Sequence, residues 1–344
     1  MRGVLPLALA CARATLLTLG CSEARSLDTR GGAGGASGSG PDAGSLDVPQ
    51  LLSQTGLYAD LGTDEALAAS VAEYRPRFEL WADGAENRRF VRLPPGSSID
   101  TNDMDYWVLP IGTRLWKEFR SDGVRVETRL LEKTGEGAWR MLAYAWDESD
   151  ADATLVPRGV ENARGTDHDI PSAVMCGECH HNVPDKALGF GAVQLAHAGP
   201  GTTLATLVDD DRLSAPPIGA LELPGDDRAQ AALGYLHANC GGCHNPRSGI
   251  FPTVRQELRL EVASLGSVEE TTIYRSTVDV PLQGVAPSPE TPELRIAPGD
   301  PAQSAIAHRM GSRDPLVQMP PLASEVVDEM GVAAIEAWIT TLAE

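Results

Sequence analysis

Two short strings constrain this chain more than any other part of its sequence: Cys176-Gly177-Glu178-Cys179-His180 and Cys240-Gly241-Gly242-Cys243-His244. Each has the pattern C-x-x-C-H, in which two thiols and an imidazole fall within about one turn of helix. The two thiols can add across the two vinyl groups of a haem, and the adjacent histidine can then reach its iron. The pattern predicts two covalently attached haem c groups, bound through Cys176, Cys179, Cys240 and Cys243, with His180 and His244 as proximal iron ligands.

Two C-x-x-C pairs have other uses, namely one structural zinc site or two disulfides in an exported protein. The histidines argue against both alternatives, because neither a four-cysteine zinc site nor a disulfide needs a histidine at that position. The chain has only 7 His among 344 residues, yet one of them directly follows each pair. The sequence therefore favours haem at both motifs.

A methionine in a loop after the second motif is a candidate for the second iron ligand. Met319-Pro320-Pro321 lies between two expected helices, and proline holds the residue before it in an extended conformation. A thioether opposite a histidine is a known axial pair on low-spin haem. The order of motif, long loop, Met-Pro-Pro and final amphipathic helix resembles that of class I cytochrome c, which implies His244 as proximal and Met319 as distal ligand. Met310 and Met330 are the rival ligands.

The distal ligand of the first haem is open in the sequence, since no methionine lies between His180 and His244. His197 is favoured by loop length alone, and an open or water-bound iron is the alternative. The remaining candidates are His168, His237, His308, Met141 and Met175.

The N-terminus is typical of an exported protein. Residues 1–20 contain Arg2 and apolar stretches and have the layout of a signal peptide. The run that ends at Cys21 resembles a bacterial lipobox and predicts a lipid anchor at that residue, with a plain cleaved signal as the alternative. Residues 21–45 are rich in Gly and Ser, as in a flexible tether. We expect a protein exported to the periplasm or the outer membrane and held there by lipid.

The formal net charge of −20 argues against nucleic acid as a partner. Such a charge suits redox partner proteins with a basic surface, although general solubility accounts for it equally well.

The distribution of aromatic residues divides the rest of the chain into two regions. Residues 46–170 hold five of the six Trp and read as β-rich, with strands expected over 88–93, 113–119, 124–131 and 139–146. Residues 171–344 read as helical, with helices expected over 228–240, from 300 onward and over 328–342. The predicted fold class is α+β, with an N-terminal β-rich, sandwich-like domain and a mainly α-helical cytochrome c-type diheme domain. The first haem region would be 171–225 and the second 226–344, and Gly234 would permit close packing of the first helix on the last.

The chain resembles a family of bacterial diheme c-type cytochromes with a β-rich N-terminal region and a class I-like cytochrome c C-terminal region. The resemblance covers about residues 50–342 and rests on several strings: 52–58, 88–94, 109–113, 127–131, 188–190, 194–195, 239–246, 298–301, 319–322 and 338–339. It implies an exported redox protein and no established substrate. We expect one-electron transfer between redox partners, hence an electron carrier rather than an enzyme. The alternatives are a diheme peroxidase-type enzyme with one open haem and an electron-transfer subunit that docks a dehydrogenase.

Overall fold

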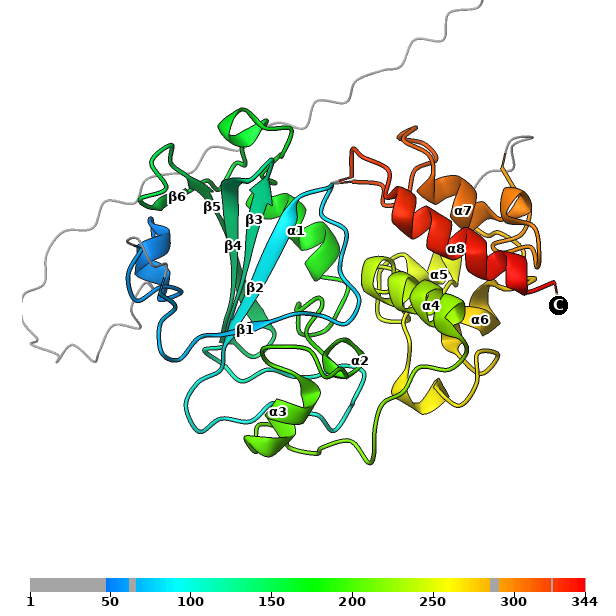
Figure 1. Ribbon diagram of the computed structural model, residues 1–344, viewed down its shortest axis with the longest axis horizontal. Coiled ribbons are helices and arrows are strands. Elements are labelled where there is room, and N and C mark those ends of the chain that lie inside the picture. The colour runs from blue at the N-terminus through cyan, green and yellow to red at the C-terminus, as the bar shows by residue number, and fades with distance from the viewer. Residues whose placement is uncertain (1–47, 62–65, 285–290, 323, 344) are drawn as a thin grey trace, which may run out of the picture. The chain divides into compact units, whose positions relative to one another are not determined.

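A six-stranded antiparallel sheet forms the first half of the protein (Figure 1). The computed structural model describes residues 48–61, 66–284, 291–322 and 324–343, and residues from Val48 to Glu344 belong to one compact unit. The predicted signal peptide, the tether and Cys21 lie outside the described residues. The strands follow one another across the sheet in chain order: β1 (Ala72–Tyr74), β2 (Glu86–Arg92), β3 (Arg114–Ser121), β4 (Val124–Gly135), β5 (Ala138–Trp146) and β6 (Ala153–Leu155).

The four strands expected from the sequence are confirmed as β2 to β5, with bounds shifted by a few residues. Local chemistry explains the central hairpin. Asp122 and Gly123 connect β3 to β4, and both have positive φ, at 50° and 77°. Two residues of this conformation match the twist of the flanking strands, and Gly adopts it without strain.

The predicted sandwich is wrong, because the described strands form one sheet rather than two facing sheets. Short segments cover its two faces instead. One face packs against the 3-10 helix at Leu52–Thr55, with Phe90, Trp116 and Tyr144 in the shared core. Part of the other face, including Val91 and Leu115, packs with Phe190, Leu195 and Leu204 from beyond residue 171. The residue pattern along a strand can indicate that both faces of a sheet are buried, but it does not specify which segments of the chain cover them.

The expected mainly α-helical cytochrome domain is also wrong. The C-terminal half combines two 13-residue helices with shorter ones of 4 to 8 residues and irregular connections. The helices are α1 (Ala173–His180), α2 (Ala192–Leu195), α3 (Leu204–Asp209), α4 (Asp227–Asn239), α5 (Phe251–Val254), α6 (Thr272–Thr277), α7 (Ala305–Met310) and α8 (Glu329–Thr341). Frequent Pro and Gly in this half interrupt helical runs.

The two long helices confirm the sequence expectation for 228–240 and 328–342. Asp226 caps α4 by accepting from the Ala229 N–H, and Asp328 caps α8 by accepting from the Gly331 N–H. Helices α4 and α8 lie side by side (Figure 1) and share a core that includes Leu233 and Trp338.

The prediction that Gly234 lets the first helix pack closely on the last is wrong, because its close neighbour is Phe78. A Cβ on Gly234 would lie 2.1 Å from the ring of Phe78, so this glycine makes room for the segment before β2. The close contact between the long helices comes from Gly331 on α8, where a Cβ would lie 2.3 Å from the ring of Tyr235 on α4. Within the described part of the chain, no helix has both the length and the apolar character needed to cross a membrane.

Candidate functional site

The first motif occupies the last turns of α1. Ser172 caps this helix, and its hydroxyl accepts from the Met175 N–H at 3.4 Å. Cys176, Cys179 and His180 then follow at helical spacings of three and four residues, which place them on one side of the helix. The local sequence therefore brings two thiols and one imidazole together before any tertiary contact forms.

His180 has the surroundings of a metal-binding histidine. Its Nδ1 lies 2.5 Å from the carbonyl oxygen of Lys186, and a carbonyl can only accept, so Nδ1 carries the proton. Burial lowers the pKa of His180 to about 4, which keeps the ring neutral at physiological pH. The Nε2 lone pair is left for a ligand, as in metal sites where a backbone carbonyl orients the ring.

The second motif continues from the end of α4. The Cys243 and His244 N–H groups both donate to the carbonyl of Cys240, at 3.1 and 2.9 Å, so the chain keeps turning after the helix. Gly241 is required here, because a Cβ would lie 2.7 Å from the His237 carbonyl oxygen and 2.8 Å from that of Leu258. The turn again groups the two thiols with the histidine.

His244 differs from His180 in its hydrogen bonding. Burial lowers the pKa of His244 to about 4, so this ring is also neutral. Its buried Nδ1 has no hydrogen-bond partner among the described residues. A buried polar nitrogen without a partner is costly, and the His244 ring lacks the carbonyl contact that orients His180.

The structure brings the two motifs together, which the sequence did not predict. The thiol of Cys179 donates a hydrogen bond to the sulfur of Cys243, and this contact lowers the pKa of Cys243 to about 7. The side-chain amide of Asn182 donates to the same sulfur at 3.6 Å. Asn245, fully buried, donates to the carbonyls of Gly241, Gly242 and Asn182 and so ties the two turns to each other.

The arrangement of the cysteines bears on the two alternatives. All four motif cysteines are free thiols. Within the described ranges, no three or more His, Cys, Asp or Glu side chains are arranged around a common point for a metal ion. A structural zinc site needs four ligands in a tetrahedron.

A cavity of about 1250 Å³ adjoins both motifs. Cys179, His180 and Cys243 line it, together with one face of the sheet and the segment around Pro320 and Pro321. Ligand sites for ordinary small molecules enclose about 300–1000 Å³, so this cavity has room for a group as large as a porphyrin. The first motif thus fits a covalently held haem, whereas of the second motif Gly242 and Cys243 line the cavity and Cys240 and His244 lie outside its lining.

The three candidate methionines for the second site have different surroundings. Met310 is buried in the core around α4 and α8, and Met330 is 83% exposed on α8. Met319 is half-buried, and its N–H donates to the carbonyl of Arg309 at 2.9 Å. Its neighbours Gln318 and Pro320 line the cavity, whereas Met319 itself lies beside the lining. Its role as a ligand remains a prediction.

For the first site, the structure favours His168 over His197. Both ring nitrogens of His197 already have partners, the Arg75 carbonyl after β1 at 2.8 Å and the Gly199 N–H at 2.9 Å. His168 lines the cavity, and its Nε2 lies 3.0 Å from a carboxylate oxygen of Glu127.

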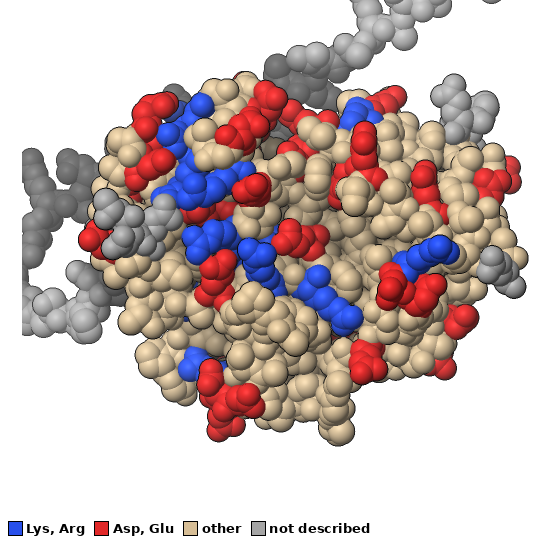
Figure 2. All heavy atoms as spheres, viewed as in Figure 1, with Lys and Arg blue, Asp and Glu red and all other residues tan. Residues whose placement is uncertain are grey.

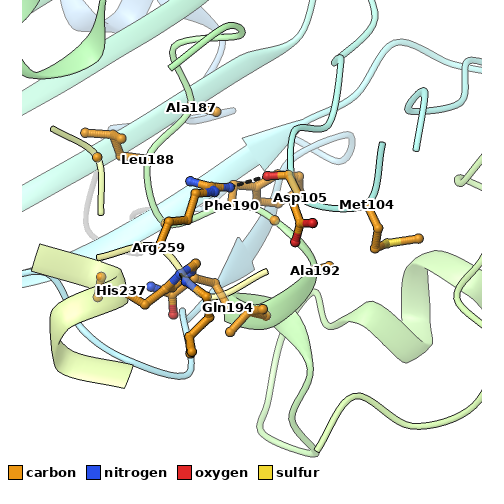
Figure 3. A pocket seen from close by; sticks show the side chains of 15 residues that line it. Met104, Asp105, Ala187, Leu188, Phe190, Ala192, Gln194, His237 and Arg259 are labelled. Carbon is orange, nitrogen blue, oxygen red and sulfur yellow. Dashed lines mark hydrogen bonds between the residues drawn. The ribbon is translucent and has the colours of Figure 1, made fainter. Parts of the chain in front are cut away.

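His237 also has a structural use of its own. Its Nδ1 accepts from the Leu260 N–H at 3.0 Å. The ring lines a small pocket beside Arg259, which donates to the carbonyl of Asp105 (Figure 3). The other remaining candidates are Met175, which lines the large cavity, and Met141 and His308, which are half-buried on β5 and α7.

Sequence reasoning missed the positive charge on the sheet wall of the cavity. Arg89, Lys117 and Arg129 line it from three neighbouring strands. The available signal was a basic residue among the apolar positions of each predicted strand. Comparison of the chain with models of protein families, with curated proteins and with solved structures found no match.

Proposed function

We propose that this protein is an exported diheme c-type cytochrome that transfers single electrons between redox partners. The observation that carries the proposal is that two C-x-x-C-H turns lie against each other beside one large cavity, which Cys179, His180 and Cys243 line. Cys176 and Cys179 would hold one haem, with His180 as its axial ligand, and Cys240, Cys243 and His244 would hold the other. When bound, each haem supplies a one-electron redox centre.

The chain's own residues support this activity in three ways. The Lys186 carbonyl fixes the tautomer and the orientation of the His180 ring. Asn245 holds the two attachment turns against each other, so the two cofactors would be neighbours. The sheet on one side and Gln318, Pro320, Pro321 and Leu322 on another line the cavity that would receive the haem.

The charge of the protein supports a basic redox partner. The chain carries a formal net charge of −20, and Figure 2 shows that basic side chains on that face gather mainly over the sheet half, with acidic ones interspersed. We expect electron transfer to a basic partner to slow as salt is added, since screening weakens long-range steering.

The decisive experiment is intact-mass analysis of protein matured in a host that attaches haem c. We expect two added porphyrins per chain, loss of one in the Cys176→Ser, Cys179→Ser variant, and loss of the other in the Cys240→Ser, Cys243→Ser variant. A matched control, Cys21→Ser, should keep both. A matured protein without added porphyrin mass would refute the proposal.

A second candidate function has one observation in its favour. The His168–Glu127 pair lines the cavity that His180 also lines, and such a pair can hold and return a proton beside an open iron. This arrangement suits a peroxidase-type enzyme. A high-spin EPR signal with peroxide turnover, lost in His168→Ala, would support the enzyme. Two low-spin signals without turnover would support the carrier.

A further inference from the structure

Three basic side chains stand directly opposite one another across the sheet wall of the cavity. In the strand register, Arg89 on β2 pairs with Lys117 on β3, and Lys117 pairs with Arg129 on β4. All three line the cavity, and we call them the cation row. Like charges placed opposite each other on neighbouring strands destabilise a sheet unless something compensates them.

Among the residues that the structure describes, Arg129 is the one member of the cation row with a counter-ion. Arg129 forms a two-pronged ion pair with Glu127, at 2.6 and 2.8 Å. Arg89 is 4% exposed, and its Nη2 is buried without a hydrogen-bond partner. Lys117 makes a cation–π contact with Phe119, at 4.3 Å from Nζ to the ring centroid. Neither Arg89 nor Lys117 has an ion pair or a hydrogen-bond partner within the described ranges.

Burial without a counter-ion makes the charges of Arg89 and Lys117 costly. Burial lowers the pKa of Arg89, and burial followed by the charges of Arg89 and Arg129 lowers that of Lys117. Glu79 and Glu127 act on them only through space. Other acidic residues line the cavity, among them Asp83, Glu161 and Glu178, but none is within ion-pair distance of Arg89 or Lys117 in the described structure.

We propose that the cation row is a carboxylate-binding site, and that the carboxylates it binds are the two propionates of the haem held at His180. This inference rests on the proposed function. His180 lines the same cavity, and the charges of Arg129 and Lys117 reach its ring. Two unpaired cations match the two propionates of one haem. The indole N–H of Trp81, which also lines the cavity and has no hydrogen-bond partner among the described residues, supplies a further donor.

The propionate assignment has a consequence that can be measured in the loaded protein. A buried cation beside a haem favours the reduced iron, which carries less positive charge, and so raises the reduction potential. It also keeps the propionates ionised. The site therefore gives the haem at His180 a different reduction potential from the haem at His244. The potential of the second haem then serves as an internal reference in the same molecule.

The test compares Arg89→Gln and Lys117→Gln with Arg88→Gln in the diheme protein. Arg88 is a matched control, because it is the neighbouring basic residue on β2 and pairs instead with Glu73 at 2.8 Å on a partly exposed surface. Both potentials are measured by spectroelectrochemistry from pH 5 to 9. We expect each cavity variant to lower one potential and make it pH-dependent. Arg88→Gln should leave both potentials unchanged, and Arg89→Lys should retain the wild-type value.

Three results would overturn the assignment. The first is that neither cavity variant moves a potential more than the control does. The second is a saturable shift of the wild-type potential with phosphate or succinate that Arg89→Gln abolishes, because the row would then bind free anions. The third is a matured protein without porphyrin, which would refute the proposed function as well, whereas two attached haems with unmoved potentials would refute the propionate site alone.

Discussion

Replacing Asp185 with asparagine should destabilise the fold strongly, because this carboxylate joins the sheet to the loop behind the first motif. Its Oδ1 accepts from the Lys133 ammonium at 2.6 Å and from the Trp139 indole N–H at 3.2 Å. Its Oδ2 accepts from the Leu109 N–H at 2.5 Å. Lys133 is 2% exposed and Asp185 7% exposed, so water replaces none of these contacts.

The expected loss follows from the charge that the variant leaves behind. Asparagine is nearly the same size, but Lys133 would stay buried without a counter-ion. Removing one partner of a buried ion pair costs about 3–5 kcal/mol. A domain is typically stabilised by about 5–15 kcal/mol in total, so the change should be large in urea unfolding followed by tryptophan fluorescence. Lys186, next in the chain, orients His180, so holoprotein spectra should also broaden.

A double-mutant cycle tests the reasoning itself. Adding Lys133→Met to Asp185→Asn should recover stability, because the buried unpaired charge is then gone. The exposed pair Arg88–Glu73 is the control, and breaking it should cost no more than about 1 kcal/mol. A loss below about 1 kcal/mol for Asp185→Asn, or no recovery in the double variant, would refute the account of a buried pair.

Three further predictions follow from the packing around the site. Gly331→Ala should lower the midpoint of thermal unfolding, because overpacking against the ring of Tyr235 costs about 1–3 kcal/mol and outweighs the gain in helix propensity of about 1 kcal/mol; an unchanged midpoint would contradict the close contact. Burial lowers the pKa of His237 to about 3. As the pH falls, the unfolded chain takes up this proton first, below about pH 6.5, so stability should decrease from there towards pH 3 by up to about 1.4 kcal/mol per pH unit. His180 and His244 add a dependence of the same sign, so His237→Gln, whose amide oxygen can still accept from the Leu260 N–H, should reduce but not abolish the slope of urea-unfolding stability between pH 7 and 5, and an equal slope would rule out a contribution from this histidine. Asn245→Ala should cost about 1–3 kcal/mol in urea unfolding, because three carbonyls lose a buried donor, and a cost below about 0.5 kcal/mol would contradict that role.

Local patterns in the sequence were sufficient for the elements that carry the motifs. The strands β2 to β5 and the helices α4 and α8 appear where turn residues, caps and apolar spacing predicted them. These signals depend on neighbours within a few residues. The C-x-x-C-H turns could be predicted from the sequence for the same reason, because both thiols and the imidazole belong to one turn of chain.

Long-range pairing decided the parts that sequence reasoning missed. The single sheet was predicted as a sandwich because an alternating strand does not specify what covers each face. Gly234 was assigned to helix packing, whereas the close neighbour is Phe78, a residue far away in the chain. The irregular C-terminal half likewise depends on tertiary contacts, such as the three backbone carbonyls that hold the buried side chain of Arg295.

The sequence by itself determined the chemistry available at two points of the chain, because each set of two thiols and an imidazole is local. Only the tertiary structure decided that these points meet, with Cys179 against Cys243, and that a cavity with the cation row adjoins them. The physical reason is that strand register and the packing of distant segments depend on burying the whole chain at once. No single stretch of residues contains that information.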